Sequence, residues 1–125
     1  MPQDENPEAN VGTEVFDLPG TLETFDGDKD LFQGMVDTFL EELPSWMGEI
    51  EKGRGLCDSR CIEKAAHSIK GTAGNFGAKF AAEAAYRLEC LAKSDRVAEM
   101  NPAIDALRDA VASLTAALRK AVEEL

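Results

Sequence analysis

The sequence predicts an all-α fold, an antiparallel up-down four-helix bundle with a short extra helix at its N-terminus. Alanine is abundant and only 6% of the 125 residues are aromatic, a composition that favours helices over sheets. Long stretches of the chain repeat apolar residues at spacings of three and four, and none alternates as a strand would. The length suits a single domain in which short connections join neighbouring helices.

The N-terminal part divides into a tail and a first helix. Residues 1–15 are acidic and polar and include two prolines, which predicts a disordered tail or linker. The bundle is expected over residues 16–125. Its first element is the stretch "FDLPGTLETF", which predicts a short helix from Leu18 to Phe25.

A long second helix is predicted from about Asp28 to Lys52. Pro44 falls inside it and has no backbone donor, so we expect a bend near Leu40–Leu43. The stretch "GRG" at 53–55 is expected to end the helix. Its apolar stripe consists of Phe32, Val36, Phe39, Leu43, Trp46 and Ile50.

Three further helices complete the bundle. Asp58 is a candidate N-cap for the third, which is expected to end near Asn75. The fourth is predicted over residues 77–93, with Phe80, Ala84, Leu88 and Leu91 on its apolar face. In the last helix, Asn101 is expected to be the N-cap residue and Pro102 the first helical residue. Its seam consists of Ile104, Leu107, Val111, Leu114, Leu118, Ala121 and Leu125.

Charge and cysteine content exclude several classes of function. The net charge of −11 argues against nucleic acid and anionic membrane as partners, and no apolar run is long enough to span a bilayer. Three cysteines without a signal peptide indicate a cytoplasmic protein with buried or half-buried thiols rather than disulfides. Cys57 and Cys61 lack further ligands for a zinc site, so we expect no metal. We expect a monomer.

The single histidine, His67, stands in a locally basic zone of this acidic chain. Residues 1–51 carry fourteen acidic residues and one basic residue, whereas six bases and three acids lie between Arg60 and Lys93. On a helical wheel His67 lies opposite the apolar seam, with Lys70, Gly71 and Gly74 on its own face. Each glycine costs about 1 kcal/mol relative to alanine in a helix. An accessible nitrogen nucleophile, a nearby cation and an open floor suggest chemistry on an anionic group that another protein delivers.

The chain shows no catalytic apparatus of its own. It has no phosphate-binding loop of the form G-x-x-x-x-G-K-[ST] and no acidic cluster near His67 for magnesium. No donors for an oxyanion hole can be identified near Ser68 in the sequence, which argues against a hydrolase.

The stretch "HSIKGTAGNFGA" resembles the signature of histidine-containing phosphotransfer (HPt) domains, roughly H-x-[IL]-K-G-x-[AS]-x-x-[ILF]-G. The resemblance extends more weakly over about residues 16–123. The positions that fit the signature are His67, Ile69, Lys70, Gly71, Ala73, Phe76 and Gly77.

The resemblance implies a phosphorelay intermediate that takes a phosphoryl group from a receiver-domain aspartate and passes it to another. His67 would be the phosphoacceptor through Nε2, and Lys70 would steady the phosphoryl oxygens. Glu89, 22 residues after the histidine, would bond the other ring nitrogen, a role that suits its expected position off the apolar seam of its helix. The alternative is an ordinary surface acid. The surface expected to meet the partner comprises Lys64, Gly71, Gly74 and Asn75.

The partners implied are response-regulator receiver domains and a sensor histidine kinase. No cofactor is expected on this chain, because the receiver would supply Mg²⁺. Two alternatives remain: the phosphoacceptor domain of a chemotaxis-type histidine kinase, and a helical adaptor with an inert histidine. The sequence leaves open whether this is a free-standing protein or a piece of a hybrid kinase.

Overall fold

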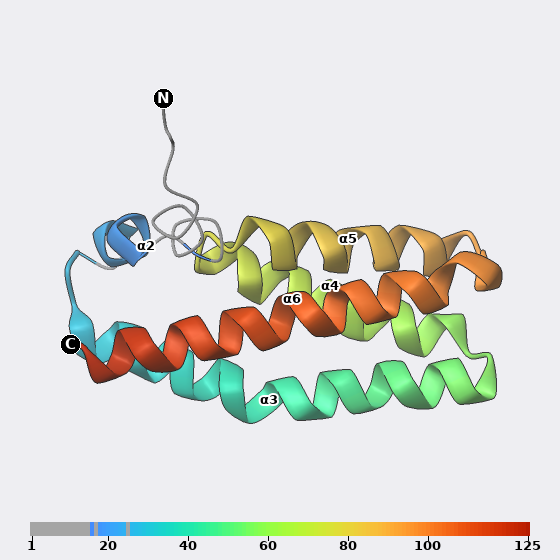
Figure 1. Cartoon of the computed structure of the whole chain (residues 1–125), viewed down its shortest axis with the longest axis horizontal. Helices are drawn as coiled ribbons and strands as arrows, with labels where there is room; N and C mark the ends of the chain where they lie inside the picture. The colour runs from blue at the N-terminus through green and yellow to red at the C-terminus, as the bar shows by residue number, and fades with distance from the viewer. Residues whose placement is uncertain (1–15, 17, 25) are drawn as a thin grey trace.

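The computed structural model describes residues 16, 18–24 and 26–125, and these residues form helices without any strand. The prediction of an all-helical fold is confirmed (Figure 1). The tail predicted for residues 1–15 and the predicted end of the first helix at Phe25 lie outside the described residues. The described helices are α2 (Leu18–Thr24), α3 (Lys29–Leu56), α4 (Ser59–Asn75), α5 (Lys79–Lys93) and α6 (Val97–Glu123).

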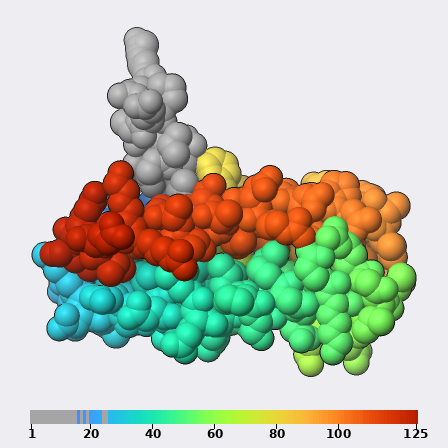
Figure 2. Space-filling model, turned by 60° about the horizontal axis from the view of Figure 1, so that its bottom comes forward, coloured from blue at the N-terminus to red at the C-terminus, as the bar shows by residue number. Residues whose placement is uncertain are grey.

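The four long helices lie along the long axis of the molecule, and successive helices run in opposite directions (Figure 1). Each packs against two neighbours, in the order α3, α4, α5, α6 and back to α3. The contact between α4 and α5 is the most extensive, and the contact between α3 and α6 is much sparser. Figure 2 shows α6 lying along α3 over the length of the molecule. The α4–α5 pair therefore offers the most closely packed support for a site.

Aromatic rings from α3 and from the residue that follows α4 fill one end of the core. Phe76 is fully buried, and its ring lies 6.0 Å from that of Phe32 and 5.7 Å from that of Phe39, measured between centroids. The Thr21 hydroxyl donates a hydrogen bond of 2.9 Å to the Phe76 carbonyl, which ties α2 to the end of α4. Gly77 then adopts a φ of +67°, a left-handed conformation that glycine reaches at little cost. Phe76 and Gly77 thus explain why α4 ends at Asn75, as predicted.

The predicted end of the second helix was wrong. The stretch at 53–55 continues α3, which ends at Leu56 and is capped by Cys57 with a φ of +55°. Gly53 is buried where α3 meets the start of α4, and a Cβ there would lie 2.7 Å from Ile62 Cγ1 and 2.8 Å from the Asp58 carbonyl oxygen. This glycine serves close packing and does not break the helix. The bend predicted near Leu40–Leu43 stays a prediction, and Pro44 lies within a continuous α3.

Asp58 caps α4 as predicted, because its side chain accepts a hydrogen bond from the Cys61 backbone N–H. The predicted start of the last helix was wrong: α6 begins at Val97, and Pro102 lies inside it. Proline there removes only one backbone hydrogen bond near a helix end. Burial of Met100 on the preceding turn favours the longer helix.

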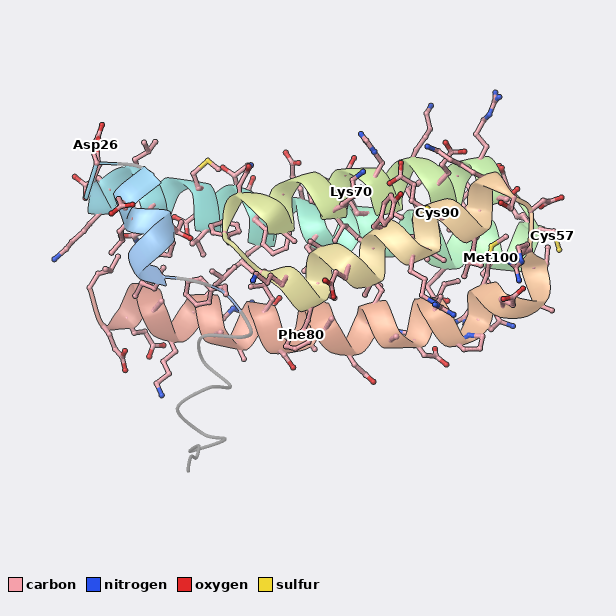
Figure 3. The ribbon with its side chains drawn as sticks, turned by 90° about the horizontal axis from the view of Figure 1, so that it is seen from above. Asp26, Cys57, Lys70, Phe80, Cys90 and Met100 are labelled. Atoms are coloured by element: carbon pink, nitrogen blue, oxygen red, sulfur yellow. The ribbon has the colours of Figure 1, made fainter. Side chains whose placement is uncertain are left out.

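The fourth helix begins at Lys79 rather than at residue 77, and its apolar face is rotated from the predicted one. Phe80 is 54% exposed and lies toward α6 (Figure 3), where it lines a hollow together with Asp109, Ala110 and Ser113. Three alanines are buried instead, together with two leucines and one glutamate. The buried residues of α5 are Ala81, Ala85, Leu88, Glu89, Leu91 and Ala92.

The predicted seams of α3 and α6 are largely confirmed, with Trp46 half-buried and Leu125 exposed. The expectation for the thiols was wrong for two of the three, since Cys57 and Cys90 are exposed and only Cys61 is half-buried. All three cysteines are free. The Cys61 thiol donates to Glu49 Oε1 at 2.9 Å, and this hydrogen bond, aided by burial, raises the pKa of Cys61.

Candidate functional site

His67 stands in the middle of α4 on the face that points away from the core. Its side chain is 66% exposed, as the helical wheel predicted. The residues that anchor this part of the chain on the opposite side are all buried: Ile62, Ala65, Ile69, Ala73 and Phe76. The sequence therefore fixes the exposure of the ring through the apolar pattern of its own helix.

Glu89 of α5 reaches the histidine ring across the α4–α5 contact. Its Oε2 lies 2.8 Å from His67 Nδ1, and its side chain is only 4% exposed. The expectation that Glu89 lies off the core was wrong. Because Ala66, Ala85 and Ala92 are small and buried, the two helices can pack closely and enclose the carboxyl between them.

Two lysines complete the surroundings of the carboxylate. Lys70 Nζ lies 3.1 Å from Glu89 Oε1, and Lys93 Nζ lies 3.6 Å from Glu89 Oε2. The Lys70 ammonium also lies over the ring of Tyr86, 5.1 Å from its centroid. Figure 3 shows Lys70 and Cys90 on neighbouring helices of this face. A buried carboxylate needs such partners, since an unpaired charge in the interior costs several kcal/mol.

The protonation state of Glu89 follows from these contacts. Burial alone would raise the pKa of Glu89, but the ion pair with Lys70 and the hydrogen bond from His67 outweigh it, so the pKa lies below its usual value. The carboxyl is therefore ionised at neutral pH and can only accept hydrogen bonds. His67 Nδ1 must then carry the proton, which leaves the lone pair of Nε2 free in the neutral ring.

The two glycines on the histidine's face border open space. A Cβ at Gly71 or Gly74 would meet no atom within 4 Å, apart from its own helix and chain neighbours. Neither residue is explained by packing within the chain. Asn75 is exposed at the end of α4.

The hydroxyls near the histidine are used within the helix. Thr72 Oγ1 donates to the Ser68 carbonyl at 3.0 Å, and Ser68 Oγ donates to the Lys64 carbonyl at 3.3 Å. These bonds to the preceding turn leave the glycines and the charged side chains as the features that distinguish the surface around His67.

A shallow hollow of about 460 Å³ adjoins the histidine. Both α4 and α5 contribute to it, and it is open to solvent. It is lined by Glu63, Lys64, His67, Ser68, Glu89 and Lys93. The site thus combines an accessible ring nitrogen with cations at the edge of an open depression.

Sequence reasoning missed Lys93 and Tyr86 as members of this site. Both lie one helical turn from Glu89, at i+4 and i−3 on α5. That spacing was a usable signal, but only once Glu89 was known to face α4.

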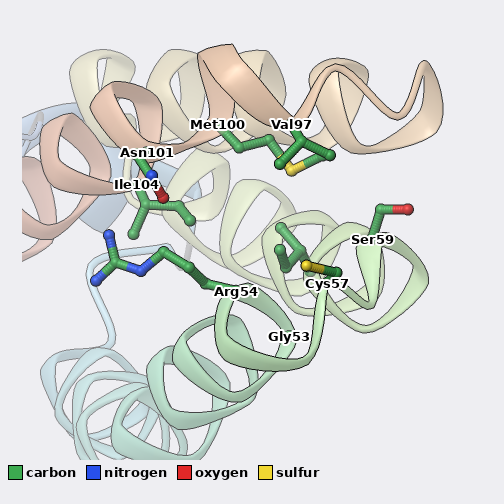
Figure 4. Close-up of a pocket in the computed structure, with 9 residues that line it drawn as sticks. Gly53, Arg54, Cys57, Ser59, Val97, Met100, Asn101 and Ile104 are labelled. Atoms are coloured by element: carbon green, nitrogen blue, oxygen red, sulfur yellow. The ribbon is translucent and has the colours of Figure 1, made fainter.

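A second hollow lies at the end of the bundle where α3, α4 and α6 meet (Figure 4). Its walls are largely apolar, and Cys57 and Arg54 stand at its edge. It contains no histidine or carboxylate. Within residues 16, 18–24 and 26–125, no group of three His, Cys, Asp or Glu side chains is placed to hold a metal ion. In the same part of the chain, no helix has both the length and the apolar character needed to cross a bilayer.

The fold is a helical bundle that presents a histidine to solvent. A buried carboxylate orients this histidine, and lysines border it. These features are those of a histidine phosphocarrier domain. A family model described as "Hpt domain" matches residues 34–120. Because the match covers more than half of the chain, the chain belongs to the Hpt domain family, whose role is histidine phosphotransfer in two-component signalling. Comparisons with curated proteins and with solved structures give no match.

Proposed function

We propose that this chain is a phosphorelay intermediate that accepts a phosphoryl group on His67 from one receiver-domain aspartate and passes it to another. The observation that carries the proposal is the Glu89–His67 hydrogen bond of 2.8 Å. It keeps the proton on Nδ1, so that Nε2 presents its lone pair on an exposed ring. The scaffold is the up-down four-helix bundle formed by α3 to α6.

In the transfer step, the Nε2 lone pair attacks the phosphorus of an aspartyl phosphate. An N–P bond forms as the P–O bond breaks, and the departing carboxylate keeps the electron pair. The ring gains positive charge because Nδ1 retains its proton. The ionised Glu89 stabilises that charge, and it lies in place before the reaction. Transfer to a second receiver is the same step in reverse.

The chain requires no metal or nucleotide site for this role, because the partner receiver is expected to bring Mg²⁺ and its own lysine. Lys64, Gly71, Gly74 and Asn75 form the proposed docking surface around the ring. The open space beside both glycines supports close approach of a partner backbone. By family resemblance Lys70 is a cation of the phosphoryl site. We further propose a monomer located in the cytoplasm.

A phosphotransfer screen tests the proposal. The full chain is incubated for short times with each phosphorylated receiver domain of the source organism, and acid-labile phosphate on the chain is measured. We expect rapid labelling by at least one receiver, and no label on the folded His67→Gln variant. Label retained on that variant would refute His67 as the acceptor. Labelling only by a kinase with ATP would favour the chemotaxis-type alternative, and no label from either source would favour the adaptor.

A further inference from the structure

A carboxylate that the proposed mechanism does not use lies beside the histidine. Glu63 is half-buried and lines the hollow next to His67. It precedes His67 by four residues on α4, so the two side chains lie on the same face of the helix, one turn apart. Helical side chains lean toward the N-terminus of their helix, which places the His67 ring over the turn that holds Glu63. A group bound to Nε2 is therefore close to this carboxylate.

Glu63 has no partner within the described part of the chain. Among those residues, no lysine, arginine or histidine nitrogen lies within ion-pair distance of its carboxylate, and its side chain makes no hydrogen bond. The nearby ammonium groups of Lys70 and Lys93 contact Glu89 instead, at 3.1 and 3.6 Å. Packing and pairing among the described residues therefore do not explain why an acid occupies position 63.

The charges that line the hollow cancel before a phosphoryl group arrives. The carboxylates of Glu63 and Glu89 are matched by the ammonium groups of Lys64 and Lys93. Lys70 adds a third ammonium next to this lining, and it contacts Glu89. A phosphoryl group carries a charge of about −1.5 to −2 near neutral pH. The lysines attract this charge, and Glu63 opposes the attraction because no cation of the described chain pairs with it.

Resting on the function proposed above, we infer that Glu63 sets how readily the phosphoryl group leaves His67. Its carboxylate repels the phosphoryl oxygens and so raises the free energy of the phosphorylated chain relative to the unphosphorylated one. Because the acceptor aspartate belongs to a separate protein, this repulsion shifts the equilibrium of transfer toward the receiver. Glu63 forms no bond to the ring and takes no proton in the reaction, and Lys70 keeps its proposed place at the phosphoryl oxygens.

The test is the equilibrium partition of phosphoryl groups between the full chain and one receiver that labels it. Both proteins are kept too dilute to form a stable complex, so that the partition reflects the free proteins and not their docking contacts. Glu63→Gln should shift the equilibrium constant toward phosphohistidine by about two- to threefold, the effect of one charge about 7 Å from the phosphorylated ring in a water-like medium. Glu63→Asp retains the charge and should stay close to the wild type. Added salt should reduce the difference between Glu63→Gln and the wild type.

A pH titration of the phosphohistidine, followed by its ³¹P chemical shift, gives a second readout that a purely structural role would not change. A neighbouring carboxylate makes the phosphoryl group release its last proton less readily, so Glu63→Gln should lower the titration midpoint by about 0.4 pH unit. The other charged groups that face this space, Lys64, Lys70, Glu89 and Lys93, are the same in both proteins.

Asp109→Asn is the matched control, because Asp109 is an exposed acid on α6, which lies across the bundle from α4. Its partition and its midpoint should equal those of the wild type. In Glu63→Gln, an unchanged partition, a shift toward the receiver or an unchanged midpoint would each refute the role of Glu63, while the labelled histidine would leave the phosphocarrier function standing. No label on the wild type, from a receiver or from phosphoramidate, would remove the proposed function and the role of Glu63 with it.

Discussion

Gly53 in α3 and Gly71 in α4 look alike in the sequence, since each follows a charged residue within a helical stretch, yet their surroundings differ completely. Gly53 is buried at the α3–α4 turn, where a side chain would collide with Ile62 and with the Asp58 backbone. A Cβ at Gly71 would meet no atom within 4 Å, apart from its own helix and chain neighbours. Gly53 is required by the fold, whereas Gly71 lowers helix stability and makes no packing contact that offsets this cost.

The α3–α4 turn and the α4–α5 face differ in how far packing explains their unusual residues. At the turn, Gly53 is explained by contacts within the chain and the left-handed Cys57 by its role as the cap of α3, whereas Gly55 borders open space. On the α4–α5 face, unusual residues remain after packing is accounted for: two open glycines, a solvent-facing histidine and a buried carboxylate. Open glycines also occur in α3, at Gly34, Gly48 and Gly55, so it is the combination of open glycines with the exposed histidine and the buried carboxylate that marks the surface used for function. Each of the following variants tests this contrast.

The largest effect on stability is expected at the turn. Gly53→Ala should lower the free energy of unfolding by about 2 kcal/mol, because the added methyl group overlaps backbone as well as side-chain atoms. Chemical denaturation followed by circular dichroism measures the change. Phosphotransfer by the fraction that remains folded should match the wild type. A variant as stable as the wild type would show that this turn is not tightly packed.

Glu89 is expected to have an intermediate effect that depends on pH. Glu89→Gln should cost about 1 kcal/mol near neutral pH, because the ion pair with Lys70 and the charged hydrogen bond with His67 are lost, and both partners are partly exposed. The pKa of Glu89 is lowered in the folded state, so its stabilisation is present above the usual carboxyl value of 4.5 and is lost as the pH falls through the folded value. The difference between wild type and variant should shrink below about pH 4.5.

Denaturation of both proteins between pH 3 and pH 7 provides this comparison, with Glu83→Gln, an exposed acid on the same helix, as the control. A difference that grows as the pH falls would contradict the direction assigned to the Glu89 pKa. Nitrogen NMR of the His67 ring should also show a weaker preference for the Nδ1–H tautomer in Glu89→Gln.

The smallest effect on stability, and of opposite sign, is expected at Gly71. Gly71→Ala should stabilise the chain by about 0.5–1 kcal/mol, because alanine fits the open helix surface and restricts the unfolded chain. Gly71→Gln should retain the fold but slow transfer from a phosphorylated receiver by at least tenfold. Labelling of His67 by phosphoramidate, which needs no docking surface, should be unchanged.

Circular dichroism establishes that the Gly71→Gln helix is intact before the rates are compared. Transfer from the receiver at the wild-type rate would show that the partner does not need the open space at Gly71. The difference between Gly71 and Gly53 would then have no functional explanation.

Much of the fold could be predicted because local patterns carry it. The apolar spacing in α3, α4 and α6 placed the core faces, Asp58 marked the start of α4, and Gly77 marked the break after it. Predictions failed where local signals competed with packing. The "GRG" stretch and Pro102 are strong breakers in isolation, but the helices continue through both because buried neighbours stabilise them. Phe80 was expected inside since it is large and apolar, yet α5 leaves it exposed and buries Ala81 and Ala85 near the same end of the helix.

The sequence by itself determined which residue is the candidate acceptor and that its ring faces solvent, because a helix places residues on faces according to their spacing alone. Only the tertiary structure decided how Glu89, Lys70, Lys93 and Tyr86 surround it. These contacts cross from α4 to α5, and they depend on how closely and in what rotation the two helices pack. No spacing within one helix specifies that packing, which explains why an acid expected to lie off the apolar seam proved to be buried at the centre of the site.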